Sequence, residues 1–283
     1  MDYQASYRAW LEAEALEPSL RAELEAISGD PAEQEERFYT ELAFGTAGLR
    51  GILGAGTNRM NVHVVRRATQ GLADYLNTFE SAKQRGVAIA YDSRRMSAEF
   101  AKEAALVLAQ NGIPAYLYST LHSVPQLSFT VLHFKCIAGI VITASHNPPA
   151  YNGYKVYWEH GGQAGPEQAE AILGCIRQVD YFGVQPMAES TALDKGLLRM
   201  IGQEVDEAYY VAIQTLLLHP ALVREKGKEL KLVYTPLHGS GYVPVREILH
   251  RIGVENVSIV AEQAQPDGSF PTVKAPNPED PAA

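Results

Sequence analysis

The pattern of apolar and polar positions changes along this chain, and each change predicts a different part of a fold. Residues 3–40 are rich in Glu, Ala and Leu and are interrupted at Pro18 and at SGDP (28–31). This predicts two or three short helices, with Pro31 at a helix start. The following stretch, FGTAGLRGILGAGTNRMN (44–61), contains too many glycines for regular structure throughout. Asn61 is expected to cap a helix over 62–79.

Short apolar runs then alternate with helical patterns. Ser97 is expected to cap the helix over 98–111, and Gly112 stands where a glycine ends that helix. The expected strands cover 87–92, 113–119, 136–144 and 153–158, and the expected helices cover 98–111, 124–134 and 166–179. Nearly uniform apolar strands separated by helices predict an α/β fold, a layered sheet sandwiched between helices.

The polar, broken stretch 181–196 predicts a linker, and a second unit follows it. Its expected elements are helices over 203–218 and 243–252 and strands over 230–237 and 256–262. These elements are fewer than a complete layered domain needs, unless the first domain supplies the partners. We therefore expect a helical amino-terminal extension (1–40), a complete first domain (41–190) and part of a second, similar domain (200–283).

Composition narrows the classes of partner. The chain has 283 residues and a formal net charge of −9, without the Lys/Arg cluster that a nucleic-acid or anionic-membrane surface needs. Two cysteines are too few for a disulfide framework. The first residues do not resemble a signal peptide, and no apolar run reaches the length of a membrane span. We expect a soluble cytoplasmic protein whose partner is a small molecule.

The stretch IAGIVITASHNPPAYNGYKVYW (137–158) places Ser145 directly after an apolar strand. Ligands gather at the carboxyl ends of strands in open α/β sheets, and the two prolines keep this loop extended. The residues alone favour a turn serine, with a nucleophilic or phosphate-carrying serine as the alternative. Period two places Lys155 on the opposite strand face from Tyr154, where it is either solvated or within reach of Ser145.

Three other loops carry chemistry of the same kind. FGTAGLRG can wrap N–H groups around a phosphate while Arg50 makes a bidentate contact, although it is neither a Walker A motif nor a dinucleotide fingerprint. YDSRR contains Arg94 at another strand end, and TPLHGSG contains His238. Taken singly, each loop is more simply structural.

Taken together and in this order, FGTAGLRG, YDSR, TASHNP with NGYK, and TPLHGSG resemble the α-D-phosphohexomutases, which include phosphoglucomutase and phosphomannomutase. The resemblance runs from about residue 40 to the end. The helical extension and FGTAGLRG are most similar to the long phosphoglucomutase/phosphopentomutase branch.

The resemblance implies an isomerase that converts glucose 1-phosphate to glucose 6-phosphate, or a mannose or pentose equivalent, through a glucose 1,6-bisphosphate-type activator. Ser145 would be the phosphoserine and, through its phosphate, a ligand of Mg²⁺. Lys155 would be the general acid/base, with Arg50 and His146 near the phosphoryl group. The remaining matched residues would bind phosphate or support the loop: Thr46, Gly48, Arg94 and Asn147.

The chain departs from the family because it contains no D-x-D-x-D-R metal loop, nor the later sugar-specificity and phosphate-binding loops. PTVKAPNPEDP resembles the segment that precedes the metal loop. We therefore expect an inactive amino-terminal fragment of a mutase, with the other metal ligands outside this chain. A phosphate-ester hydrolase and a non-catalytic phosphosugar-binding module are the alternatives.

Overall fold

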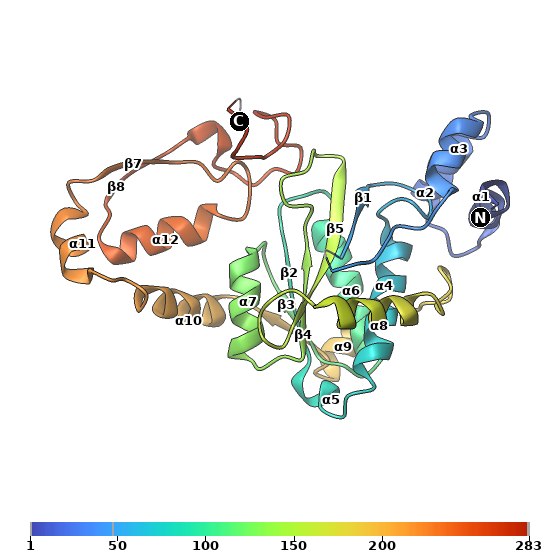
Figure 1. Ribbon diagram of the computed structural model, residues 1–283, viewed down its shortest axis with the longest axis horizontal. Coiled ribbons are helices and arrows are strands. Elements are labelled where there is room, and N and C mark those ends of the chain that lie inside the picture. The colour runs from blue at the N-terminus through green and yellow to red at the C-terminus, as the bar shows by residue number, and fades with distance from the viewer. Residues whose placement is uncertain (1, 47, 282–283) are drawn as a thin grey trace.

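The structure is a computed structural model that describes residues 2–46 and 48–281, and it contains two α/β units (Figure 1). The described part of the first unit contains a six-stranded sheet. Its strands, in spatial order, are β1 (Leu49–Ile52), β5 (Tyr151–Trp158), β4 (Ala138–Ile142), β2 (Val87–Tyr91), β3 (Ala115–Tyr118) and β6 (Leu198–Ile201). The last four are parallel, whereas β5 runs antiparallel to both β4 and β1.

Helices cover both faces of this sheet, as the sequence predicts. One face packs against α4 (Val62–Leu76), α6 (Ser97–Gln110) and α8 (Pro166–Ile176). The other face packs against α7 (Val124–His133) and the start of α10 (Gln203–Gln214). Alternate side chains of β2 enter the two apolar cores, Val87 and Ile89 on one face and Ala88 and Ala90 on the other. Burial on both faces explains why this strand is apolar throughout.

The amino-terminal segment forms three short helices, as expected: α1 (Tyr3–Glu12), α2 (Pro18–Ala26) and α3 (Pro31–Phe38). Pro31 is the first residue of α3, and the Asp30 carboxylate caps it by accepting from the backbone N–H of Glu33 at 3.1 Å. Trp10 makes edge-to-face contacts with Phe38 and with Phe182. These contacts fasten the extension to the chain that follows α8.

Two expectations are wrong. Ser97 does not cap α6: Met96 precedes the helix with φ 65°, and the Ser97 hydroxyl donates instead to the Asp92 carboxylate at 2.7 Å. The stretch 181–196 is not a linker throughout, because it contains α9 (Glu189–Asp194), whose Ala192 is fully buried. Strand β6 follows it and pairs with β3 at the sheet edge, so the first sheet extends past the expected linker. A short helix, α5 (Ala82–Arg85), leads into β2.

The second unit contains a parallel pair, β7 (Lys231–Tyr234) and β8 (Asn256–Ile259), with α11 (Pro220–Lys226) and α12 (Tyr242–Ile252). A 3₁₀ turn over Ala261–Gln263 follows β8. Arg251 of α12 makes a bidentate ion pair with Glu207 of α10, at 2.7 and 2.8 Å. Large apolar side chains of this unit remain exposed, including Val233 at 74%.

The segment after β8 returns toward the first sheet, between the two units in Figure 1. The Ser93 hydroxyl donates to the backbone carbonyl of His238 at 2.8 Å, and the Phe270 ring covers the Arg94 guanidinium. A Cβ on Gly268 would lie 2.7 Å from the backbone of Ser93 and Arg95, so only glycine allows this approach. Among the described helices, none has both the length and the apolar character to cross a membrane.

Candidate active site

Ser145 lies at the carboxyl end of β4, exposed, after five fully or nearly fully buried strand residues. Its backbone has φ 56°, a left-handed conformation that is uncommon for a residue with a Cβ. The Thr143 hydroxyl accepts a hydrogen bond from the Ser145 N–H at 2.9 Å, and the Asn147 N–H donates to the carbonyl of Ala144. These bonds turn the chain sharply at the strand end. The loop therefore presents the serine to solvent in a strained backbone conformation, a feature that clusters at functional sites.

Arg94 holds this loop from beneath. One guanidinium nitrogen donates to the carbonyls of Pro148 and Tyr151 at 2.9 and 3.2 Å. The other donates to the carbonyls of Ser145 and Asn147 at 2.9 and 2.6 Å. Arg94 is almost completely buried. Its planar fork ties both ends of the loop to one rigid group, so the loop conformation does not depend on its two prolines alone.

The positive charge of the Arg94 guanidinium is only weakly neutralised by its neighbours. Its Nε lies 3.5 Å from the Asp92 carboxylate and makes no hydrogen bond within residues 2–46 and 48–281. Asp92 accepts instead from the Arg94 backbone N–H and from the Ser97 hydroxyl. Burial lowers the pKa of Arg94, and the charge of Asp92 partly offsets this. A buried cation beneath Ser145 favours negative charge above the loop.

Lys155 lies on β5, which pairs with β4, and Arg50 lies on β1, which pairs with the other edge of β5. Lys155 pairs in register with Val141, and Arg50 pairs with Gly153. Burial, and next the positive charge of Arg50, lower the pKa of the Lys155 amine from its ordinary 10.5. Arg50 donates to the side-chain oxygen of Asn147 at 2.9 Å. The structure therefore brings Arg50, which lies 97 residues before Asn147 in the sequence, to the loop that carries Ser145.

Gly48 makes this arrangement possible. Its φ is 77°, and a Cβ there would lie 2.0 Å from the carbonyl oxygen of Tyr154 and 2.8 Å from the Lys155 Cα. Gly48, whose backbone N–H bonds to the Gly45 carbonyl at 2.7 Å, can approach β5 only because it has no side chain. Thr46 is exposed. No hydrogen bond of Thr46 to the loop is present in the described part of the chain.

A cavity of about 470 Å³ opens over Ser145, between the two units. The first unit contributes Asp92, Ser93, Thr143, Ser145 and His146, and the second contributes residues 234–237 and 239–241 with Phe270, Pro276 and Pro278. The Ser145 hydroxyl lies 3.3 Å from Nδ1 of His146. A small ligand in this cavity would contact the serine directly.

His238 has a structural role and does not line the cavity. It is 3% exposed, and its ring nitrogens bond to the Gln265 carbonyl and the Thr272 hydroxyl at 3.1 and 3.0 Å. This agrees with the structural interpretation from sequence. Sequence reasoning missed Phe270, because no local pattern indicates that a residue in an irregular segment will cover the Arg94 guanidinium.

Apart from the Ser145 oxygen, the described residues offer no group of ligands suited to a Mg²⁺ ion. Across residues 2–46 and 48–281, no three His, Cys, Asp or Glu side chains are grouped to hold a metal. Asp92 is the carboxylate among the cavity's lining residues, and its hydrogen bonds to Arg94 and Ser97 already use one of its oxygens. Magnesium at Ser145 therefore remains a prediction from the resemblance.

The chain is similar to known proteins over most of its length. Residues 41–182 match the phosphoglucomutase/phosphomannomutase alpha/beta/alpha domain I, and residues 207–283 match domain II of the same family. A phosphoglucomutase of Staphylococcus saprophyticus is 38% identical over 252 residues, covering 89% of this chain and 44% of that protein. The human phosphopentomutase is 36% identical over 259 residues, covering 89% of this chain and 42% of that protein.

Solved structures agree in fold. A phosphomannomutase-type protein of Thermus thermophilus superposes with a TM-score of 0.68 at 25% identity, covering 83% of this chain and 48% of that one. The Paramecium phosphoglucomutase parafusin superposes with a TM-score of 0.60 at 17% identity, covering 82% and 45%. The chain thus spans less than half the length of these relatives. The two matched domains, with the loops around Ser145, show that this chain belongs to the phosphoglucomutase/phosphomannomutase family.

Proposed function

We propose that this chain carries the phosphoserine part of a phosphosugar mutase, an isomerase that moves a phosphoryl group between two oxygens of one sugar. Ser145 is the phosphoryl carrier. The observation that carries the proposal is the exposed, left-handed Ser145, clamped by Arg94 and open to a cavity between the two units.

Local charge supports this role. The chain has a net charge of −9, yet three cations, Arg50, Arg94 and Lys155, belong to the loop's own surroundings. A phosphoserine has a charge of about −1.5 to −2. It would offset the mutual repulsion of Arg50 and Lys155 and the poorly compensated charge of Arg94. A neutral substrate would gain nothing from such an arrangement.

The chemistry follows from these groups. The bond from phosphorus to Ser145 Oγ breaks, and a bond from phosphorus to a sugar hydroxyl oxygen forms. The hydroxyl proton passes to the neutral amine of Lys155, whose lowered pKa increases the fraction able to accept it. The leaving Ser145 Oγ takes up a proton from water in the open cavity. Arg50 and His146 position the phosphoryl oxygens. The sugar bisphosphate then reorients, and its other phosphate returns to Ser145 Oγ, whose proton passes to water. Lys155 gives its proton to the sugar oxygen that is released.

Hexose and pentose phosphates are the proposed substrate class, because the relatives include a phosphoglucomutase and a phosphopentomutase. A sugar bisphosphate is the proposed activator, since it leaves Ser145 phosphorylated. We further propose that the 283-residue chain does not isomerise sugars by itself, because the sugar-specificity loop implied by the resemblance has no match in it. Thr46 and Gly48 are proposed as loop residues beside the phosphate.

Phosphoryl transfer to Ser145 is the direct test. Because the chain by itself is expected to be inactive, it is fused to the remaining domains of the Staphylococcus saprophyticus phosphoglucomutase and incubated with glucose 1,6-bisphosphate and Mg²⁺. Intact mass spectrometry with peptide mapping then locates any phosphoryl group. We expect one phosphoryl group on Ser145 and none in Ser145→Ala. Arg8→Gln, an exposed substitution on α1 away from the loop, serves as the matched control. Phosphorylation of the alanine variant to the same extent would refute the role of Ser145.

The same reaction separates the alternatives. A hydrolase would release inorganic phosphate at each turnover, so phosphate would exceed the protein concentration. A non-catalytic binding module would bind the bisphosphate, as calorimetry would show, but leave the mass of the protein unchanged. Only the mutase proposal predicts a stable phosphoserine with stoichiometric formation of the monophosphate.

A further inference from the structure

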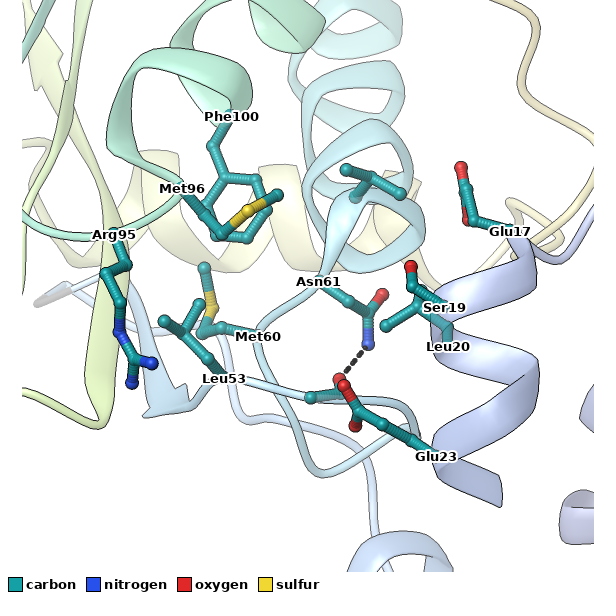
Figure 2. Close-up of a pocket in the computed structure, with 12 residues that line it drawn as sticks. Glu17, Ser19, Leu20, Glu23, Leu53, Met60, Asn61, Arg95, Met96 and Phe100 are labelled. Atoms are coloured by element: carbon teal, nitrogen blue, oxygen red, sulfur yellow. Dashed lines mark hydrogen bonds between the residues drawn. The ribbon is translucent and has the colours of Figure 1, made fainter. Parts of the chain in front are cut away.

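A second cavity, of about 370 Å³, lies between α2 and the loop that joins β2 to α6 (Figure 2). Its centre is apolar and is formed by Leu53, Met60 and Phe100, the last two completely buried. Figure 2 shows Arg95 at one end and the α2 side chains Ser19, Leu20 and Glu23 toward the other. The amino-terminal extension therefore forms one wall and the first α/β unit the other.

The acidic groups of this cavity are already engaged by the protein. Glu17 bonds to the His63 ring at 2.7 Å. One oxygen of Glu23 accepts from the Ala55 backbone N–H at 3.0 Å and from Arg37 at 3.1 Å. These contacts fasten α2 to the first unit and leave both carboxylates on the α2 side of the cavity.

Arg95 differs from these groups. It is exposed, and its guanidinium makes no hydrogen bond or ion pair with any residue in the described ranges. Next to it, the Arg94 guanidinium makes four bonds to loop carbonyls. One end of the cavity thus offers an unpaired, forked cation beside apolar walls.

We propose that this cavity binds a small amphiphilic monoanion, a carboxylate or sulfonate on an aromatic or branched apolar body. The anion pairs with Arg95, and the body contacts the accessible apolar side chains Leu20, Leu53 and Met96, which lie over the buried Met60 and Phe100. The volume falls in the range of small-molecule sites, about 300–1,000 Å³. Phosphosugars do not suit it, because apolar walls leave hydroxyl groups without partners. Polyanions do not suit it because Glu17 and Glu23 form the opposite wall.

The site is connected to the Ser145 loop through a short segment. The side-chain amide of Asn152, at the start of β5, donates to the Arg95 carbonyl at 2.9 Å and to the Ser97 hydroxyl at 3.0 Å. Met96, between them, has φ 65° and lines the cavity. A ligand that contacts Arg95 and Met96 therefore restrains the same segment from which Arg94 clamps the loop. This site stands whether or not Ser145 carries a phosphate.

Fluorescence titration of the 283-residue chain with 1-anilinonaphthalene-8-sulfonate, an aromatic monoanion, tests the site. We expect a saturable component whose affinity falls roughly tenfold or more in Arg95→Gln, because a charge-assisted hydrogen bond is lost. Ser19→Phe, on the exposed surface of α2, is expected to fill the cavity and remove this component. Arg8→Gln is the matched control and should bind as the unaltered chain does.

Amide hydrogen exchange gives the second readout. Residues 143–152 should exchange more slowly when the probe is bound, and this protection should be lost in Arg95→Gln. Unchanged probe affinity in both Arg95→Gln and Ser19→Phe would overturn the proposal. So would gel filtration showing a dimer that Ser19→Phe dissociates, since the cavity would then hold a second copy of this chain.

Discussion

Replacing Arg94 by methionine tests whether one buried side chain holds the serine loop. Methionine retains most of the apolar stem but removes the guanidinium that donates to four loop carbonyls. It also leaves Asp92 without its cation at 3.5 Å. Removing one member of a buried ion pair costs about 3–5 kcal/mol. The carbonyls of this exposed loop can regain water, so we do not add a separate cost for each lost bond.

We therefore expect Arg94→Met to lower the free energy of unfolding of the first unit by about 3–5 kcal/mol. Arg94→Lys keeps the charge but not the fork, and should lose about 1.5–3 kcal/mol, the value of a hydrogen bond to a charged group. Urea unfolding followed by tryptophan fluorescence measures this, because Trp158 belongs to the first unit and Trp10 to the extension packed against it.

Arg95→Met is the matched control, since the neighbouring side chain is exposed and unpaired in the described structure. It should change stability by no more than about 0.5 kcal/mol. A loss below about 1 kcal/mol in Arg94→Met, with unchanged hydrogen exchange of the Ser145 loop, would refute the clamp.

Three further predictions concern the same site. Gly48→Ala should lower the free energy of unfolding by about 2–4 kcal/mol, because the new methyl group would clash with the Tyr154 carbonyl and the left-handed φ is strained for alanine. Gly174→Ala, which adds a methyl group in open space within α8, should instead stabilise the chain slightly in the same urea assay. Ser145→Gly should be more stable than Ser145→Ala by about 1 kcal/mol, because glycine adopts φ 56° without strain; equal stabilities would contradict the strained loop. The pKa of Lys155 is lower in the folded chain than in the unfolded chain, so the unfolded chain binds more protons between that pKa and 10.5. The free energy of unfolding should therefore rise with pH across this window, and Lys155→Met should lose the rise when unfolding is measured across it.

The sequence predicts much of the first unit correctly because its signals are local. Uniformly apolar strands indicate burial on both faces, and the structure confirms it in the two cores that share β2. Pro31 and Asn61 mark helix starts through groups within three residues of themselves. Four motifs in order indicate the family, which the two matched domains confirm.

Errors arise where residue-type preferences compete with specific contacts that the fold makes. Ser97 is a good capping residue by type, yet Asp92 takes its hydroxyl and Met96 adopts the left-handed conformation instead. The stretch 181–196 is polar enough for a linker, but α9 is stabilised by burying Ala192 against the first unit. Asp92 lies only five residues before Ser97, but helix-capping preference by residue type does not show that its carboxylate accepts the Ser97 hydroxyl. The residues that bury Ala192 belong to other elements of the first unit.

For the site, the sequence by itself determined which residues are available: a serine after a buried strand, two prolines, a lysine with period-two placement, and the arginines of two other loops. Only the tertiary structure decided how these residues act together. It places the Arg94 guanidinium under the carbonyls of Ser145 and Asn147, and it places Arg50 and Lys155 close enough for their charges to interact. The physical reason is that hydrogen bonds and charge interactions depend on distance in space, whereas the sequence records only distance along the chain.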